Sequence, residues 1–137
     1  MEGLQQICLA CFQLIPVEER TCPRCGADLA ALSARDYREK LVHALLHPLA
    51  DIRIRAIIAL GWRGETETAD ALLECALQHP MDVVQGLEII NSLSRMHEMS
   101  IARTTLSILK ARHPAHAIRE GAARALASLP NQREPDA

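Results

Sequence analysis

Residues 51–61 read Asp-Ile-Arg-Ile-Arg-Ala-Ile-Ile-Ala-Leu-Gly, and this stretch holds the first leucine of a set that recurs along the chain. Leu60, Leu93 and Leu126 are separated by 33 and 33 residues, and small or apolar residues recur around each of them. A period of this length is typical of stacked helical hairpins, because a single hairpin cannot bury its apolar face without neighbours. The stretch therefore predicts an array of helices.

The dipeptide His-Pro recurs at nearly the same interval, at 47–48, 79–80 and 113–114. Proline is tolerated at the start of a helix, where its missing N–H costs little, so each pair is expected to separate two helices. The histidines are expected to cap helix C-termini and to pack in the loops. Asp82 with Gln85, and Ser33 with Asp36, predict capping boxes at two helix starts. The expected helices lie near 34–46, 49–61, 67–78, 82–95, 99–111 and 115–128.

Composition supports helices, because 49% of the residues are hydrophobic while only 2% are aromatic. Leu, Ala, Ile and Val supply this apolarity, which disfavours a β-sandwich or barrel, and its extent excludes an intrinsically disordered chain. Residues 52–60 and 83–93 are apolar on more than one side of a helix, so we expect both helices to be buried between layers.

Charge and targeting signals narrow the class of protein. The net charge of −2 argues against a general nucleic-acid binder, which should be basic. Residues 3–17 carry no charge, but no basic segment precedes them as in a secretory signal. No apolar run reaches the roughly 18 to 20 residues of a membrane-spanning helix. Five cysteines without an export signal indicate a reducing compartment, so we expect a cytoplasmic protein without a membrane segment.

Four of the five cysteines form two pairs, Cys8-Leu-Ala-Cys11 and Cys22-Pro-Arg-Cys25. Two residues between thiolates let one tight turn direct both sulfurs at a single ion, and two such turns complete a tetrahedral S4 shell that suits Zn²⁺. We expect the connection between the pairs to form a β-hairpin, and Gly26 to adopt a positive φ after the last ligand. A segment this short cannot bury enough apolar surface to fold alone, so the metal is expected to stabilise it.

This arrangement resembles zinc-ribbon and double-knuckle modules over residues 8–29, with the C-x2-C…C-P-x-C-G pattern as the recognisable part. A rubredoxin-like iron site shares the second knuckle and is the main alternative, although rubredoxins space their pairs further apart and surround the iron with aromatic residues. Four filled ligand positions leave no open site for chemistry, so one structural Zn²⁺ is the expected cofactor.

The predicted organisation is a zinc ribbon over residues 1–32, a helical domain over 33–130 and a flexible tail over 131–137. The fold class is therefore expected to be all-α: an α–α superhelix of about six helices with a small N-terminal zinc-ribbon module. The ribbon, or Leu29 and Leu32 just after it, is expected to cover the open end of the first helix.

Residues 51–61 and 118–126 resemble the first helix of HEAT repeats, particularly the short bacterial kind also found in phycobilisome lyases. The middle copy departs from the pattern, because Gly86 stands where Arg53 and Arg119 stand in the others. The resemblance covers about residues 37–128. It implies an α–α solenoid that binds a protein, with the second helix of each hairpin lining a concave surface.

On these second helices, the positions that point away from the expected core are candidate partner contacts. They are Arg38, Glu67, Asp70, Glu74, Arg103 and Ser107. Trp62 is expected either to fold over the edge of the core or to anchor a partner, and Cys75 is expected to be a small buried residue.

No catalytic constellation is apparent. His97-Glu98 is similar to the His-Glu pairs of HEAT-repeat di-iron hydroxylases, but those need several such pairs, and nothing identifies the tetrapyrrole pocket of a bilin lyase. Residues 1–32 offer only Arg20 and Arg24 against four acids, although a nucleic-acid-associated regulator acting through the ribbon remains the alternative. The leading hypothesis is a non-catalytic adaptor that binds a protein partner, with no small-molecule substrate.

Overall fold

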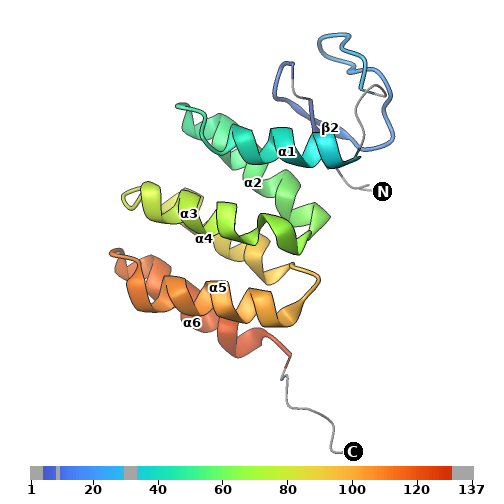
Figure 1. The fold of residues 1–137 in the computed structure, drawn as a ribbon. Helices are drawn as coiled ribbons and strands as arrows, with labels where there is room; N and C mark the ends of the chain where they lie inside the picture. Colours follow the sequence, from blue (N-terminus) through green and yellow to red (C-terminus); the bar gives the residue numbers. More distant parts are fainter. Residues whose placement is uncertain (1–4, 9, 30–33, 131–137) are drawn as a thin grey trace, which may run out of the picture.

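The computed structural model describes residues 5–8, 10–29 and 34–130. Over these residues the chain is mostly helical and carries a small strand pair near its N-terminal end (Figure 1). The strands are β1 (Gln5–Ile7) and β2 (Leu14–Pro16), which pair antiparallel. The helices are α1 (Ala34–Ala44), α2 (Ala50–Arg63), the 3-10 helix η1 (Thr66–Thr68), α3 (Ala69–Gln78), α4 (Val83–Ser94), α5 (Met99–Arg112) and α6 (His116–Ser128).

All six predicted α-helices are present, and each end lies within two residues of its expected position. Asp82 caps α4 as expected, because its carboxylate accepts a hydrogen bond from the backbone N–H of Gln85. The second half of the predicted capping box is wrong: the Gln85 side chain is buried and accepts a hydrogen bond from Arg53 instead. Ser33, the predicted cap of the first helix, and the predicted tail over 131–137 lie outside the described residues.

The helices lie in two layers, with α1, α3 and α5 in one and α2, α4 and α6 in the other (Figure 1). Short loops make consecutive helices antiparallel, so every second helix returns to the same layer. The core between the layers is aliphatic, and its largest fully buried side chains come from all six helices. They include Leu41, Ile57, Leu60, Leu72, Ile89, Leu93, Leu106, Leu109 and Ile118.

Glycines set how closely α2, α4 and α6 approach one another. A methyl group on Gly61 would lie 2.5 Å from Oγ of Ser92 and 3.1 Å from its Cα, so α2 and α4 touch at this point. The Ser92 hydroxyl donates to the carbonyl of Ile57, which satisfies the polar atom buried in the contact. A methyl group on Gly86 would lie 2.5 Å from Cδ1 of Ile118 on α6, so Gly86 makes room for that side chain.

Two arginines tie the His-Pro loops to the helices that follow them. Arg53 Nη1 donates to the carbonyls of His47 and Pro48, at 2.8 and 3.1 Å. Arg119 Nη1 donates in the same way to the two residues of the third His-Pro pair, both at 2.8 Å. Gly86 removes this arginine from the middle copy, where Arg53 itself reaches across to Gln85 on α4 at 2.7 Å. The departure of the middle copy from the sequence pattern therefore has a packing reason.

Two of the three loop histidines, His47 and His113, make hydrogen bonds to the backbone. Nδ1 of His47 and Nδ1 of His113 each accept a hydrogen bond from the backbone N–H two residues on, both at 3.0 Å. Because Nδ1 of His113 is an acceptor, the neutral ring carries its proton on Nε2, which lies 3.2 Å from the carbonyl of Ala76 near the end of α3. His113 thereby joins the α5–α6 loop to the preceding helix pair.

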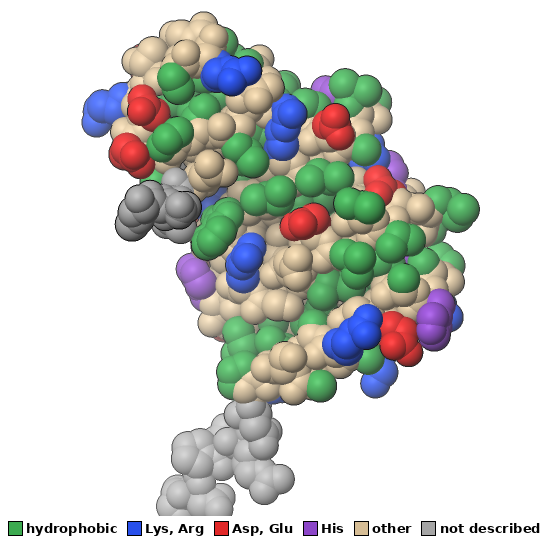
Figure 2. Space-filling view, turned by 180° about the vertical axis from the view of Figure 1, so that it is seen from behind, with side chains coloured by type: hydrophobic (Ala, Val, Ile, Leu, Met, Phe, Trp, Pro, Cys, Tyr) green, Lys and Arg blue, Asp and Glu red, His purple; other side chains and the backbone are tan. Residues whose placement is uncertain are grey.

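One side of the helical body differs from the expectation. Val84 and Leu87 on α4 are 65% and 40% exposed, so the prediction that residues 83–93 are buried all round between layers is wrong for this side. Hydrophobic side chains gather over the outer side of the α2, α4 and α6 layer (Figure 2). Within the described ranges, none of the helices combines the length and apolar character that crossing a bilayer requires.

Substituting Gly61 tests the close contact of α2 with α4. We expect Gly61→Ala to lower the free energy of unfolding by about 2 kcal/mol or more, because the new methyl group meets backbone and Cβ atoms that cannot move freely. Gly121→Ala is the matched control, since its methyl group would meet only side-chain ends of Ile90 and Leu87, at 3.1 and 3.2 Å. Urea unfolding followed by circular dichroism measures both, and equal stabilities would contradict the role of Gly61.

Protonation of His113 is expected to destabilise the fold. Burial lowers the pKa of His113 from its usual value of 6.5, and the nearby Arg119 charge lowers it further, although the Ala76 carbonyl opposes this. The unfolded chain then binds the proton more readily than the folded one, so stability is full above the unfolded pKa and falls as pH drops below it. We expect a shallower loss of stability from about pH 7 to about pH 5 in His113→Asn, which keeps the acceptor but does not titrate. Parallel pH profiles for the two proteins would refute this.

Candidate functional site

The two Cys-x-x-Cys segments form turns of the same geometry. In the first, the N–H of Cys8 donates to the carbonyl of Gln13 at 2.9 Å, and the N–H of Phe12 donates to the carbonyl of Cys8 at 2.6 Å. In the second turn, the N–H of Cys22 donates to Ala27 and the N–H of Gly26 donates to Cys22, both at 2.9 Å. Each turn therefore presents its cysteines in the same way.

The closing residue of each turn has a positive φ. Gly26 has a φ of 80°, which confirms the expectation from the sequence. Phe12 occupies the equivalent place in the first turn with a φ of 62°, an uncommon conformation for a residue with a Cβ. The hairpin is also placed differently from the prediction, because β1 and β2 enclose the first turn instead of linking the two turns.

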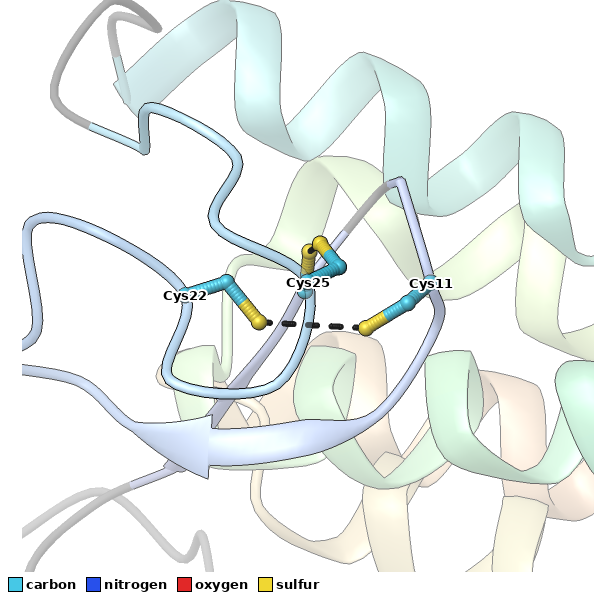
Figure 3. A group of neighbouring side chains, drawn as sticks. Cys11, Cys22 and Cys25 are labelled. Carbon is cyan, nitrogen blue, oxygen red and sulfur yellow. Dashed lines mark hydrogen bonds between the residues drawn. The ribbon is translucent and has the colours of Figure 1, made fainter.

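The turns bring the four predicted ligands together (Figure 3). All four Sγ atoms lie within 4.8 Å of one another. The Cys8–Cys25 sulfur separation is 3.6 Å and the Cys11–Cys22 separation is 3.8 Å. Sulfurs at the corners of a tetrahedron around a Zn²⁺-sized ion lie about 3.8 Å apart. All five cysteines of the chain are free, so the cluster is suited to a metal ion.

The thiols of this cluster are not equally ready to ionise. Burial would raise the pKa of Cys22, but the backbone N–H groups of Cys25 and Arg24 outweigh it and lower that pKa to about 7. The N–H of Ala27 favours the Cys25 thiolate, yet burial and the neighbouring thiols raise the pKa of Cys25 to about 12. Four thiolates this close repel one another, so full ionisation of the cluster requires a cation.

The cluster has a small apolar surround of its own. Ile15 is buried against Cys8 and Cys22, and Leu29 packs on the same group. The strand pair and the two cysteine turns, residues 5–8 and 10–29, are called the metal module below. Leu29 packs within this module and does not cover the end of α1, while Leu32 lies outside the described residues. Val17, two residues after Ile15, is exposed and takes no part in this apolar group.

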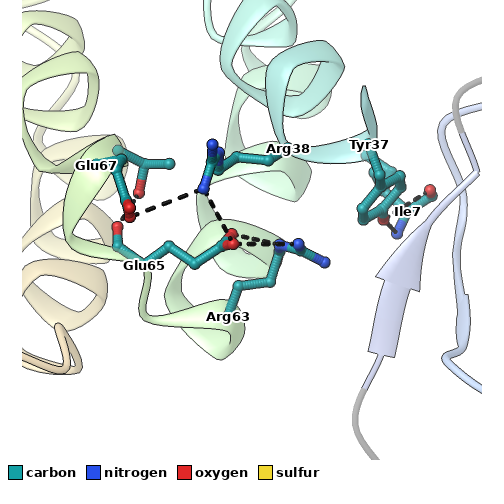
Figure 4. Close-up of polar contacts among 7 residues, drawn as sticks. Ile7, Tyr37, Arg38, Arg63, Glu65 and Glu67 are labelled. Carbon is teal, nitrogen blue, oxygen red and sulfur yellow. Dashed lines mark hydrogen bonds and ion pairs between the residues drawn. The ribbon is translucent and has the colours of Figure 1, made fainter. Parts of the chain in front are cut away.

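Residues next to the ligands join the module to the helices. Ile7, adjacent to Cys8, is fully buried in the core of the helical body. Its carbonyl accepts a hydrogen bond from the Tyr37 hydroxyl at 2.9 Å, and its N–H donates to the same oxygen (Figure 4). Burial raises the pKa of Tyr37 to about 12, so the hydroxyl stays protonated and can keep donating.

Phe12, adjacent to Cys11, makes the second connection. Its ring packs against the helical core and meets the His47 ring edge-on, with 5.6 Å between ring centroids. Its carbonyl accepts a hydrogen bond from Nη1 of Arg55 on α2, at 3.1 Å. This role of Phe12 was not predicted, and the only signal for it in the sequence is the position of Phe12 directly after a ligand. The module thus covers the α1–α2 end of the body, as expected.

The candidate partner contacts all come from α1, η1, α3 and α5, so the structure places them in one layer of the body. Glu67, Asp70, Glu74 and Ser107 are exposed. Arg38 is half-buried and lies 3.4 Å from Glu65 and 3.8 Å from Glu67, so its charge is already paired (Figure 4). Arg103 donates to the carbonyl of Pro130.

A groove of about 320 Å³ runs between α1 and α3. Val42 and Leu46 on the α1 side and Ala71 on α3 give it apolar walls, and Leu46 is 66% exposed. Cys75 lines its floor, where burial raises the thiol pKa to about 11 and keeps it unreactive near neutral pH. Glu74 stands on the rim, so the groove borders the predicted partner contacts.

A second hollow, of about 400 Å³, lies between the metal module and α2. Tyr37 and Trp62 form part of its wall. Trp62 is 46% exposed and carries the Arg95 guanidinium over its ring at 4.5 Å, so the indole is neither folded into the core nor bare. Arg63 and Glu65 in the same hollow pair with each other at 2.6 Å.

The chain matches no known protein family, curated protein or solved structure in the comparisons made.

Metal binding provides the direct test of the cysteine cluster. We expect one metal ion per chain, lost in Cys22→Ser and retained in Cys75→Ala, because Cys75 lies in the helical core away from the cluster. Inductively coupled plasma mass spectrometry counts and identifies the ion. We also expect chelation to lower the melting temperature of the helices, since Ile7 and Phe12 connect the module to them. A metal content unchanged by Cys22→Ser would contradict the assignment.

Proposed function

We propose that the protein is a non-catalytic adaptor, built from a short HEAT-type α–α solenoid and a ribbon held by one structural zinc ion, which binds a protein partner on the layer formed by α1, α3 and α5. The groove between α1 and α3 is the observation that carries this proposal, because it combines apolar walls with an acidic rim. The proposal concerns a cytoplasmic protein, as expected from the sequence.

The repeated loop geometry supports a HEAT-type solenoid. The first and third His-Pro pairs are held by equivalent arginines through equivalent hydrogen bonds, and the middle pair is followed by Gln85, which Arg53 contacts. Alternating helices form two stacked layers, the arrangement in which such hairpins bury their apolar faces.

Zinc is favoured over iron by the surroundings of the cluster. Phe12 is the one aromatic residue of the ribbon segment, and its ring packs on the helical body and on His47, away from the sulfurs. Four thiolates without an open ligand position suit an ion that stabilises the fold. Elemental analysis that finds iron, with a red solution, would exclude zinc.

The chemistry of the α1–α3 groove indicates the kind of segment it accepts. Glu67, Asp70 and Glu74 follow one another at intervals of three and four residues, so they form a row along one side of η1 and α3. Arg38 neutralises part of Glu67, and Glu74 accepts a hydrogen bond only from Gln78 at 3.3 Å among the described residues. A partner segment with an apolar anchor flanked by lysine or arginine complements this surface.

The test is affinity purification from the native cell, followed by binding measurements on the recovered partner. We expect alanine at Glu67, Asp70, Glu74 and Arg103 together to weaken binding at least about tenfold, because several moderate contacts are lost at once. A triple variant measures the contribution of the acidic row by itself, because it replaces Glu67, Asp70 and Glu74 and keeps Arg103. This separation is needed because Arg103 also contacts Pro130.

A matched control changes three acids and one base elsewhere. The control replaces Glu18, Glu98, Glu120 and Arg124 by alanine. These residues are exposed and lie outside the groove, so binding should be unchanged. If both quadruple variants bind the partner as tightly as the wild type, the binding site lies elsewhere and the proposed surface is wrong.

A further inference from the structure

The outer side of α2 and α4 carries two matching rows of side chains that point away from the core. The row on α2 is Asp51, Ile54, Arg55, Ile58 and Trp62. The row on α4 is Val84, Leu87, Glu88, Asn91 and Arg95. Every member is exposed or half-buried, and the two rows have the same spacing, offset by 33 residues. We call these two rows together the outer face.

The two rows lie side by side and run in the same direction. Near the start of the helices Arg53 reaches Gln85, and near their ends Gly61 touches Ser92. Trp62, the last member of one row, stacks with Arg95, the last member of the other. Members that correspond in sequence are therefore neighbours in space.

Five of the ten members of the outer face are large apolar residues, namely Ile54, Ile58, Trp62, Val84 and Leu87. Figure 2 shows hydrophobic side chains gathered across this side of the molecule, and Trp62, Val84 and Leu87 are exposed large apolar residues of the outer face. Contiguous apolar surface on a small protein commonly marks a place where another molecule binds. Val84 is 65% exposed, and Leu87, whose side chain packs near Gly121 on α6, is 40% exposed.

The two rows are complementary to each other, and this identifies the partner. At one position both rows are aliphatic, with Ile54 on α2 and Leu87 on α4. At the next position the charges are opposite, with Arg55 on α2 and Glu88 on α4. Among the described residues, the half-buried Glu88 carboxylate has no hydrogen-bond or ion-pair partner, so it is free to meet a cation.

A two-fold axis that lies in the outer face and runs parallel to the helices uses this complementarity twice. Such a rotation preserves position along the helices and places α2 of one copy over α4 of the other. Ile54 then faces Leu87 of the second copy, and Arg55 faces Glu88 of the second copy. Each contact occurs twice because the interface is self-complementary.

We propose that the outer face of α2 and α4 is a homodimer interface, in which a second copy of this chain packs α4 against α2 about a two-fold axis parallel to the helices. At about 1.5 Å per residue, α2 and α4 are each about 20 Å long. A two-helix face of this length is at the small end of specific interfaces, where weak and transient association is common.

Sedimentation velocity of the metal-loaded full chain, over a range from low micromolar to the highest soluble concentration, tests the proposal. The wild type should shift from one chain to two as concentration rises. Leu87→Glu should raise the dimer dissociation constant at least about 30-fold, because it places a carboxylate in the apolar part of the interface. Leu46→Glu is the matched control, since Leu46 is also exposed but lines the α1–α3 groove, and it should dimerise like the wild type.

Charge exchange tests the geometry. Glu88→Arg should weaken the dimer, because the new guanidinium faces Arg55 of the second copy, and Arg55→Glu should weaken it likewise. The double variant Arg55→Glu/Glu88→Arg should regain most of the lost affinity, since the opposite charges meet again. Because Arg55 also holds the Phe12 carbonyl, metal content and circular dichroism establish that each variant is folded.

Three results would overturn the proposal. If the wild type remains a single chain at every concentration, the outer face is not a homodimer interface. A Leu87→Glu variant that dimerises as the wild type does places the interface elsewhere. A folded double variant that does not recover affinity excludes the parallel two-fold arrangement.

Discussion

The close approach of α2, α4 and α6 is the constraint on which the helical body depends. Gly61 lets α2 reach the backbone of Ser92, and Gly86 accepts the Ile118 side chain from α6. A larger residue at Gly61 would push the two helices apart and open the core beneath them, because protein interiors are packed to crystalline density. The spacing of this layer also fixes the His-Pro loops, since Arg53 can contact both its own loop and Gln85 only when α4 lies this near.

The metal module depends on the body, and the body on the module, through residues adjacent to ligands. Ile7 precedes Cys8, and Phe12 follows Cys11, so the geometry that brings the sulfurs together also positions these two side chains. Ile7 is buried in the core beside Tyr37. Phe12 has an uncommon positive φ, and its ring packs against His47. An ion bound by the four cysteines would therefore stabilise the α1–α2 end as well as the ribbon.

Periodic and local signals were enough to predict the helices and the four ligands, because both are governed by residues close in sequence. The leucine period and the His-Pro pairs locate helix ends, and the Cys-x-x-Cys spacing defines the cluster. What could not be predicted depends on distant neighbours. In the sequence, Gly86 is only a departure from the arginine of the other two copies. The structure shows that Gly86 makes room for the Ile118 side chain, which is 32 residues away in the sequence.

The exposure of Val84 and Leu87 was missed for a related reason. The sequence of a helix that is apolar on two sides is the same whether or not a further layer covers the second side. Periodicity shows the direction in which a side chain points, but not what lies beyond it. The body has two layers, so the second apolar side of α4 faces outward. The resemblance to HEAT repeats predicts partner contacts in the other layer, where the candidate residues are charged and partly paired among themselves.

The two proposed surfaces, the α1–α3 groove and the outer face, lie in opposite layers of the body. The α1–α3 groove is small and presents few aromatic anchors, so a single copy should bind a short segment weakly. Pairing through the outer face of α2 and α4 leaves the grooves of the two copies uncovered and directed away from each other. A partner that carries two basic segments on a linker long enough to span the dimer gains affinity from the second contact without any new interaction, because that contact becomes intramolecular. The proposed dimer would therefore select partners by the number and spacing of their segments, which a single groove cannot do.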